Sequence, residues 1–262
     1  MREVHASEQK AILEYLAPHV EECLYLYLDI YWYGIGSDTI KVWCGDEKDG
    51  EYSFVVMKYF SCFQLYSKHN NFDPNELIEL AKAENVDRVF ARKDTIEYLQ
   101  PAFGDGYVAE FGEILELNKH RDFGDMYSRI ENATMEDLPE ITELLLMDEE
   151  NALSYNYDEL LETLQNLISS GMGRCFVLRE NGKIVAHVAI SAETDIFMIG
   201  AYTMVHPDYR NTLYGMLVDS YVNRIVRGNK RLFGFVMDPR RIRMFRALGN
   251  KVVAEYGKLI RV

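Results

Sequence analysis

The spacing of apolar residues in the second half of the chain predicts alternating strands and helices. After a short β-like run, residues 134–145 and 157–171 carry leucine and isoleucine at helical spacing. Thr134 is suited to cap the first helix and Gly171 to end the second. Two β-like runs then flank Asn181-Gly182, the dipeptide that most strongly favours a two-residue hairpin. The pattern therefore begins β-α-α-β-β.

Beyond the hairpin, the pattern continues with a strand around residues 196–205 and a helix that ends at Gly228. A buried-type strand, a short helix between Pro239 and Gly249, and a last strand complete the chain. The full order, β-α-α-β-β-β-α-β-α-β, contains one hairpin and two strand–helix–strand crossovers. It predicts an α/β fold, of the α+β type, with a mostly antiparallel mixed sheet flanked by helices.

The first half has a weaker version of the same pattern. A helical region up to residue 34 precedes two β-like runs around Asp49-Gly50, and a helix begins near Asp73-Pro74. A strand, a helix and a strand follow, so the predicted order α-β-β-α-β-α-β parallels that of the second half. From the order of elements alone, we expect an internal structural repeat.

A polar stretch without sustained periodicity, residues 117–129, separates the two patterns. The length of 262 residues fits one large domain or two of about 130 residues. We therefore predict one domain at residues 1–120 and a second at residues 128–262.

Charge is unevenly distributed over a chain whose net charge is −14. Residues 1–125 hold 12 basic and 24 acidic residues, whereas residues 201–262 hold 12 basic and 4 acidic ones. The overall balance argues against a nucleic-acid partner, because phosphate contacts need clustered lysine and arginine. A basic region confined to the last quarter suits a small polyanionic ligand better, although a solvated charged face is the alternative.

The cysteine and hydropathy patterns predict a cytoplasmic protein without a membrane partner. The four cysteines show no CxxC pair and no zinc-site spacing, so we expect reduced thiols and no metal. No run of 18 apolar residues occurs, and the N-terminal residues do not have a signal-peptide pattern. The sequence leaves the oligomeric state open, with a homodimer as one arrangement.

The stretch Val205–Gly215, VHPDYRNTLYG, leaves a predicted strand and opens a predicted helix. Such a turn exposes backbone N–H groups at the positive end of the helix dipole, which together bind a pyrophosphate. The loop and its lead-in, His206-Pro207-Asp208-Tyr209, resemble those of the GNAT superfamily of N-acetyltransferases. With the order of elements and the Asn-Gly hairpin, the resemblance covers about residues 129–262.

The resemblance implies that acetyl-CoA is the co-substrate and that its pyrophosphate lies on this loop. The strand end at Met204 and Val205 would pair with the pantetheine arm as an added strand does. The cofactor-binding residues that the resemblance implies are Met204, Val205, Arg210, Asn211, Thr212, Leu213, Tyr214, Gly215, Asp238 and Phe245.

Three of these residues depart from the family pattern. Leu213 stands where the family has the middle glycine of its loop, and its side chain would either crowd the phosphates or point into the core. Asp238 replaces an asparagine. Phe245 replaces a tyrosine that commonly protonates the leaving thiolate, a loss that typically costs on the order of 10²–10⁴-fold in rate.

The transfer also needs a group that accepts the proton of the attacking amine. The strand before the loop carries no acid, so the candidates are Glu193, His187 and Tyr202. His187 alternates with apolar residues, which favours a structural histidine over a base. For Tyr202, a packing role is favoured over a catalytic one.

The first half has no equivalent of the loop, so we expect it not to bind coenzyme A in this way. Its negative charge would attract a cationic acceptor, such as a small-molecule or peptide amine. Three functions remain open: an N-acetyltransferase, a catalytically weak acyl-CoA-binding sensor, and a Fem-type peptidyl transferase. The acidic charge and the lack of a coiled-coil arm argue against the third.

Overall fold

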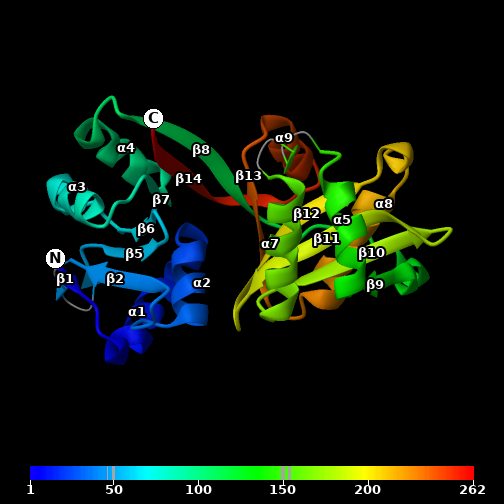
Figure 1. The fold of residues 1–262 in the computed structure, drawn as a ribbon, viewed down its shortest axis with the longest axis horizontal. Coiled ribbons are helices and arrows are strands. Elements are labelled where there is room, and N and C mark those ends of the chain that lie inside the picture. Colours follow the sequence, from blue (N-terminus) through cyan, green and yellow to red (C-terminus); the bar gives the residue numbers. More distant parts are fainter. Residues whose placement is uncertain (46, 49–50, 149–150, 153–154) are drawn as a thin grey trace. The chain divides into compact units, whose positions relative to one another are not determined.

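The computed structural model describes residues 1–262 except 46, 49–50, 149–150 and 153–154. It divides into two compact units (Figure 1). Unit 1 comprises Met1–Ile114, Val236–Ile242 and Val252–Val262, and unit 2 comprises Leu115–Phe235 and Arg243–Lys251.

Unit 1 is built on a sheet with the strand order β1-β2-β5-β6-β7-β14-β8. All the strand pairs with a described register are antiparallel except β6 and β7, which run parallel. The strands are β1 (Arg2–Glu3), β2 (Ile40–Cys44), β5 (Val55–Tyr59), β6 (Cys62–Tyr66), β7 (Arg88–Arg92), β8 (Tyr107–Glu116) and β14 (Lys251–Arg261), and β3 (Glu47–Lys48) and β4 (Glu51–Tyr52) form a separate ribbon.

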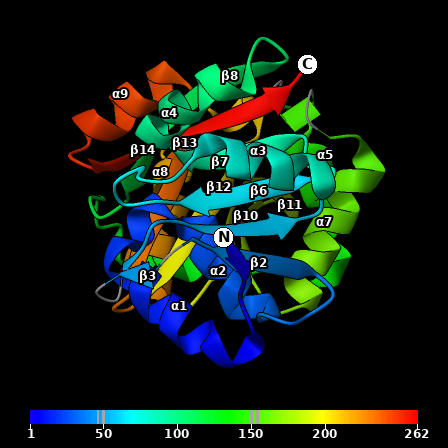
Figure 2. The same ribbon diagram turned by 90° about the vertical axis from the view of Figure 1, so that its left-hand side faces the viewer.

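Helices cover both faces of this sheet (Figure 2). They are α1 (Gln9–Leu16), α2 (Leu24–Tyr33), α3 (Pro74–Ala83) and α4 (Lys93–Phe103), with the 3-10 helices η1 (Ala6–Glu8) and η2 (Ala17–Glu22) beside α1. The face under α3 and α4 holds a core in which Leu77 and Ile96 pack with Phe63 and Val89 of the two parallel strands. Helices α1 and α2 lie on the opposite face.

Unit 2 has the sheet order β13-β12-β11-β10-β9, in which only β12 and β13 are parallel. The strands are β9 (Ile130–Asn132), β10 (Arg174–Glu180), β11 (Lys183–Glu193), β12 (Phe197–Val205) and β13 (Arg231–Val236). The helices are α5 (Leu138–Leu145), α7 (Tyr157–Ser169) and α8 (Tyr214–Tyr221), with the π-helical turn η6 (Val222–Val226) and the 3-10 helices η3 (Gly124–Arg129), η4 (Met135–Asp137) and η5 (Pro207–Tyr209). Helix α9 (Pro239–Ala247) begins in unit 1 and ends in unit 2.

Two cores sandwich the sheet of unit 2. Helices α5 and α7 contribute Ile141 and Leu164 to one core, which also contains Val177 and Met204 of the sheet. Helix α8 packs on the other face, where Leu217 belongs to a second core. Figure 1 shows α5 and α7 in front of this sheet and α8 behind it. The predicted mixed sheets flanked by helices are thus confirmed.

The elements predicted for the second half are present in the predicted order. Asn181 and Gly182 form the turn between β10 and β11 with φ of 49° and 79°, as a hairpin of this type requires. In the first half, the prediction of a single strand for the second β-like run is wrong, because this run folds into two strands, β5 and β6. Its turn lies at Phe60, whose φ of 50° is unusual for a bulky residue and which no glycine or asparagine signals. The predicted turn at Asp49-Gly50 lies outside the described residues.

The division of the chain differs from the predicted one at its end. The change of unit at residue 115 lies near the predicted boundary, but Val236–Ile242 and Val252–Val262 belong to unit 1. The reason is strand pairing: β14 runs antiparallel to β7, with Tyr256 opposite Arg92 and Ile260 opposite Arg88. A pattern of apolar residues identifies a strand but not the sheet that it joins.

Candidate functional site

The two parallel strands of unit 2 separate before they end. Strands β12 and β13 pair only at Phe197–Arg231, Met198–Leu232 and Ile199–Phe233. Beyond Ile199, β12 has no partner on that side among the described residues, although it continues to Val205. In open α/β sheets, ligands bind at the carboxyl ends of strands that part in this way.

A β-bulge lies in the part of β12 that continues beyond its pairing with β13. The register runs from His187–Met204 directly to Ala189–Ala201, so Tyr202 and Thr203 together oppose one residue of β11. Tyr202 has a φ of 53°, a left-handed conformation that costs a non-glycine residue roughly 1–2 kcal/mol. Such bulges bend a strand and commonly lie beside binding sites.

His187 holds this bulge from the face that α5 and α7 cover. Its Nδ1 lies 2.8 Å from the Tyr202 carbonyl oxygen, which requires Nδ1 to carry the proton and donate. The ring is buried, and its Nε2 has no partner among the described residues. Burial lowers the pKa of His187 to about 4, so the side chain is neutral near pH 7.

A second side chain holds the bulge from the opposite face. Asp219 of α8 accepts a hydrogen bond of 2.8 Å from the Thr203 hydroxyl. Asp219 and Thr203 were not predicted as site residues, because neither belongs to the loop and their meeting depends on the bulge. Together with His187, they fix the conformation of the strand where it leaves β13.

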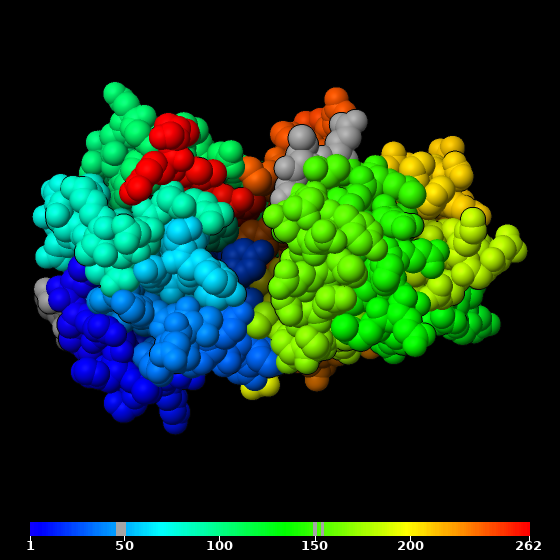
Figure 3. Space-filling view, in the orientation of Figure 1, coloured from blue at the N-terminus to red at the C-terminus, as the bar shows by residue number. Residues whose placement is uncertain are grey.

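The loop after β12 folds back on itself and then opens helix α8. The 3-10 turn η5 is closed by the amides of Tyr209 and Arg210, which donate to His206 and Pro207 at 2.8 and 3.3 Å. Thr212 returns to the Tyr209 carbonyl through its amide at 3.0 Å and its hydroxyl at 2.6 Å. Arg210, Asn211 and Thr212 are exposed, and Figure 3 shows this stretch, gold in the colour scale, at the surface of unit 2.

The first turn of α8 leaves amides available. The N-cap residue, Leu213, makes no side-chain capping bond, and the hydroxyl of Thr212 reaches only the Tyr214 amide, at 3.3 Å. Within the described residues, the amides of Gly215 and Met216 have no acceptor, as expected for the first turn of a helix. The turn therefore offers free donors and the positive end of the helix dipole.

Leu213 and Gly215 have separate roles in this turn. The side chain of Leu213 is 45% exposed, so of the two alternatives for this residue it does not point into the core. At Gly215, an added Cβ would come within 3.2 Å of Val205 Cγ2. The glycine thus lets the start of the helix lie against the end of β12.

Tyr214 belongs to a polar cluster at the edge of the loop. Its hydroxyl donates to the Glu180 carboxylate, to which Arg129 also binds, at 2.5 Å. Arg129 lies over the Tyr214 ring at 5.4 Å. Hydrogen bonds from Tyr214 and Arg129 lower the pKa of Glu180. This cluster ties the start of α8 to the β10–β11 hairpin.

Glu193 lies far from the loop. It stands opposite Met198, near the start of β12. From Met198 to Val205, where the loop begins, seven residues of strand span about 23 Å. Its carboxylate binds Arg174 at 2.6 Å and also Lys230. Its pKa is lowered because these two cations outweigh its partial burial. Of the three predicted base candidates, the structure brings only His187 and Tyr202 together.

Two of the residues that depart from the family pattern, Asp238 and Phe245, lie at the start of α9 and within it. Asp238 accepts a hydrogen bond of 2.7 Å from the Arg240 amide and so caps α9, as an asparagine would. Phe245 is half-buried. In unit 2, the carboxamide oxygen of Asn250 accepts from the amides of Asn118 and Lys119 at 3.0 and 2.9 Å.

Unit 1 contains a matching strand–helix–strand element. Strands β6 and β7 are parallel, pair at only three positions and separate beyond Gln64–Phe90. Helix α3, which connects them, is capped by Asp73, whose carboxylate accepts from the Asn75 amide at 3.0 Å. Pro74 at the first position has no N–H to offer. The N-terminus of α3 thus presents a carboxylate where α8 presents free amides.

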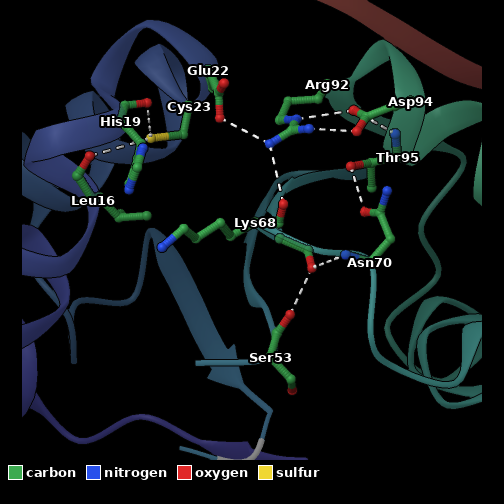
Figure 4. A network of polar contacts seen from close by, with 11 residues as sticks. Leu16, His19, Glu22, Cys23, Ser53, Lys68, Asn70, Arg92, Asp94 and Thr95 are labelled. Carbon is green, nitrogen blue, oxygen red and sulfur yellow. Dashed lines mark hydrogen bonds and ion pairs between the residues drawn. The ribbon is translucent and has the colours of Figure 1, made fainter. Parts of the chain in front are cut away.

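Side chains of unit 1 also bind the loop after β6 (Figure 4). Arg92, at the end of β7, binds Glu22 at 3.0 Å and the Lys68 carbonyl at 3.5 Å. The loop itself is tied by Asn70, whose carboxamide accepts from Thr95 at 2.8 Å and whose amide donates to Ser67. The loop after β6 is therefore held in place by hydrogen bonds within unit 1.

The described part of the chain holds no cluster of three or more metal-ligating side chains, and none of its helices is long and apolar enough to cross a membrane.

No family model and no curated protein matches the sequence. Solved structures resemble the chain along its length at low identity. A GNAT-family acetyltransferase from Colwellia psychrerythraea has a TM-score of 0.59 at 11% identity, with 100% of this chain and 99% of the other covered. A tandem GNAT protein from the clavulanic acid biosynthesis pathway has a TM-score of 0.56 at 13% identity, covering 98% and 96%. A GNAT structure from Kribbella flavida reaches 0.57 at 14% identity, covering 100% and 96%. At these identities, the likeness shows the fold.

Proposed function

We propose that unit 2 transfers an acetyl group from acetyl-CoA to a primary amine of a small molecule or peptide. The observation that carries this proposal is the separation of β12 from β13 directly before a helix with free N-terminal amides. A pyrophosphate suits those amides, and an extended pantetheine arm suits an unpaired strand. The likeness in fold to GNAT acetyltransferases agrees with this assignment.

Acetyl-CoA supplies an acetyl group activated as a thioester. The amine nitrogen would attack the thioester carbonyl carbon, the carbon–sulfur bond would break, and the amine would lose one proton while the thiolate gains one. In this scheme, the amides of Gly215 and Met216 bind the phosphates. The bulge at Tyr202 and Thr203, fixed by His187 and Asp219, sets the path of β12 beyond its pairing with β13. Holding the reactants in place accounts for a large part of such a rate.

The proton steps are the weaker part of this chemistry. Phe245 has no proton to give to the leaving thiolate, which would take one from water. His187 is buried with a pKa of about 4, and Glu193 is held by two cations, so neither is well suited to accept a proton at neutral pH. We therefore propose that the amine loses its proton to solvent, which predicts faster turnover at alkaline pH.

These same residues favour a second candidate function, a sensor that binds acyl-CoA without efficient transfer. The sensor and the enzyme share the loop and the unpaired strand and differ only in turnover. The acidic first half, with a net charge of −12 over residues 1–125, favours a cationic acceptor and hence the enzyme.

One experiment separates the two functions. The full chain is incubated with acetyl-CoA and a panel of primary amines, polyamines included, while free thiol is followed and binding is measured by calorimetry. Release of thiol that depends on one amine supports the enzyme. Binding without thiol release on any amine supports the sensor. If acetyl-CoA does not bind at all, both functions are wrong and the loop is only a turn.

A further inference from the structure

Unit 2 has a second polar region at the end of α8 opposite to the loop. There the π-helical turn η6 faces the segment 117–123, and Ser220 binds the Arg121 carbonyl and the Tyr127 hydroxyl. The Arg227 amide donates to Val222, five residues back, at 2.8 Å. Single π-turns are rare in proteins and occur frequently at functional sites.

Buried polar atoms without partners are concentrated in these two segments. Of eight such atoms in the described chain, four lie here: Asn118 Oδ1, His120 Nδ1, Asn223 Oδ1 and Arg227 Nε. A buried polar group without a partner is uncommon in folded proteins and indicates a bound water, ion or ligand. Of these four atoms, Arg227 Nε and His120 Nδ1 can donate to an anion, whereas the two asparagine oxygens only accept. Arg227 has no carboxylate partner in the described chain, although a half-buried guanidinium is normally paired.

The charge of this region is mostly positive. Arg224 binds Asp122 at 2.7 Å, which leaves Arg227 and the adjoining Lys119 without a neighbouring acid of their own in the described chain. Partial burial, together with the positive charges of Arg224 and Arg227, lowers the pKa of His120, while Asp122 opposes this effect. Arg224 and Arg227 belong to the basic last quarter of the sequence, to which the proposed acetyl-CoA loop contributes only Arg210.

We propose that His120, Arg224 and Arg227 form a binding site for a phosphate group, separate from the loop at Gly215. Arg227 Nε is a donor without an acceptor, and His120 Nδ1 donates in one of its neutral tautomers. Arginine forks fit phosphate oxygens bidentately, and donors on two separate segments suit a tetrahedral anion. The site lies about 18 Å along the helix from Gly215, since twelve residues at 1.5 Å each separate it from Arg227.

The carbonyl end of a helix is unfavourable for an anion, but the arginines offset that effect. Asp122 already places a carboxylate at this end, held by Arg224. Arginines near a helix C-terminus are commonly explained as partners of the helix dipole. That explanation does not account for a buried Nε without an acceptor, whereas a bound phosphate does.

The test is a titration of the full chain with inorganic phosphate, followed by NMR in the absence of acetyl-CoA and amine. We expect saturable shifts of the His120 ring resonances and a rise in the pH at which His120 titrates. Arg227→Gln should weaken phosphate binding at this site about tenfold or more. Arg88→Gln, which changes an exposed arginine of unit 1, should leave it unchanged.

Because phosphate also suits the loop, the Gly215 amide resonance is followed in the same titration. Shifts at Gly215 without shifts at His120 would overturn the proposal and leave the proposed acetyl-CoA site intact. An equal response to acetate would overturn the assignment to phosphate. Methyl phosphate distinguishes the sources: a response like that of inorganic phosphate indicates the phosphate group of an organic ligand, and a response to inorganic phosphate alone indicates the free ion.

Discussion

Helices α3 and α8 connect parallel strands in the same way but begin differently. Asp73 caps α3 with its own carboxylate, and Pro74 removes one amide. Leu213 leaves α8 without a side-chain cap, and the amides of Gly215 and Met216 remain available. The strand pairing is alike in both, three positions followed by separation. The N-cap residue, rather than the strand pairing, therefore decides whether such an element can accept an anion.

The two units also differ in the ionisable group that each one buries under its sheet. Burial raises the pKa of Asp29 in unit 1 to about 7 and lowers the pKa of His187 in unit 2 to about 4. Folded Asp29 holds its proton more tightly than unfolded Asp29 does. The stability that unit 1 gains from this difference is therefore lost as pH rises from about 4 through 7. Folded His187 resists protonation, so stability is lost as pH falls below about 6.5. Acid thus favours unit 1 and disfavours unit 2.

The largest effect is expected for Asp29→Asn. The substitution removes a buried charge to which Gln64 donates a hydrogen bond of 2.8 Å, and it should raise the free energy of unfolding at pH 8 by up to about 4 kcal/mol. At pH 4 it should change little. Both tryptophans, Trp32 and Trp43, lie in unit 1, so their fluorescence during urea unfolding follows this unit. An equal gain at both pH values would contradict the raised pKa.

His187→Gln tests the opposite pH dependence in unit 2. A glutamine amide can still donate to the Tyr202 carbonyl but has no titrating ring. The wild-type protein should lose about 3 kcal/mol of stability in unit 2 between pH 6.5 and 4, and the variant should not. Hydrogen exchange of unit 2 amides measures the difference. His187→Leu is the matched variant without a donor, and only it should disturb the backbone chemical shifts of Tyr202.

Leu213→Asp gives α8 a carboxylate N-cap like the one that Asp73 gives α3. The carboxylate would cap the free amides and repel a pyrophosphate, so acetyl-CoA affinity should fall tenfold or more, which is about 1.4 kcal/mol. Leu213→Asn caps without a charge and should reduce affinity less. Calorimetry measures both. Unchanged binding in the aspartate variant would show that the phosphates do not use this turn.

Asp73→Ala should have the smallest effect, a loss of about 1 kcal/mol in the stability of unit 1. The variant removes the cap of α3, yet the Pro74 position still lacks an amide and Arg92 still binds the Lys68 carbonyl of the preceding loop. We therefore expect no gain of acetyl-CoA binding. Tryptophan fluorescence reports the stability, and calorimetry reports the binding. If the variant gains acetyl-CoA binding, the Asp73 cap alone prevents unit 1 from binding acetyl-CoA.

Most elements of the fold could be predicted because their signals are local. The turn at Asn181-Gly182 and the helix end at Gly171 follow from residues that tolerate positive φ. The turn at Phe60 could not be predicted, since a phenylalanine in that conformation is sustained by the surrounding sheet and by its ring contact with Tyr59. The placement of β14 in unit 1 depends on long-range pairing, which periodicity does not encode.

The candidate site was only partly predictable for the same reason. The loop from Arg210 to Gly215 is contiguous, so its pattern is visible in the sequence. The bulge is not, because it exists only through the register between β11 and β12. His187 was identified as a candidate, but its contact with the Tyr202 carbonyl, and that of Asp219 with Thr203, depend on this register.

The position of β14 also affects how the chain is made. Within β14, Tyr256–Ile260 pair with β7, yet the ribosome produces them only after all of β9–β13. At 5–20 residues per second, the synthesis of β14 follows that of β8 by on the order of ten seconds, and during this time unit 1 lacks a strand. During that time, β7 has an open edge, the kind of surface that invites pairing with other chains. Unit 1 is thus begun first during synthesis but cannot be completed before unit 2.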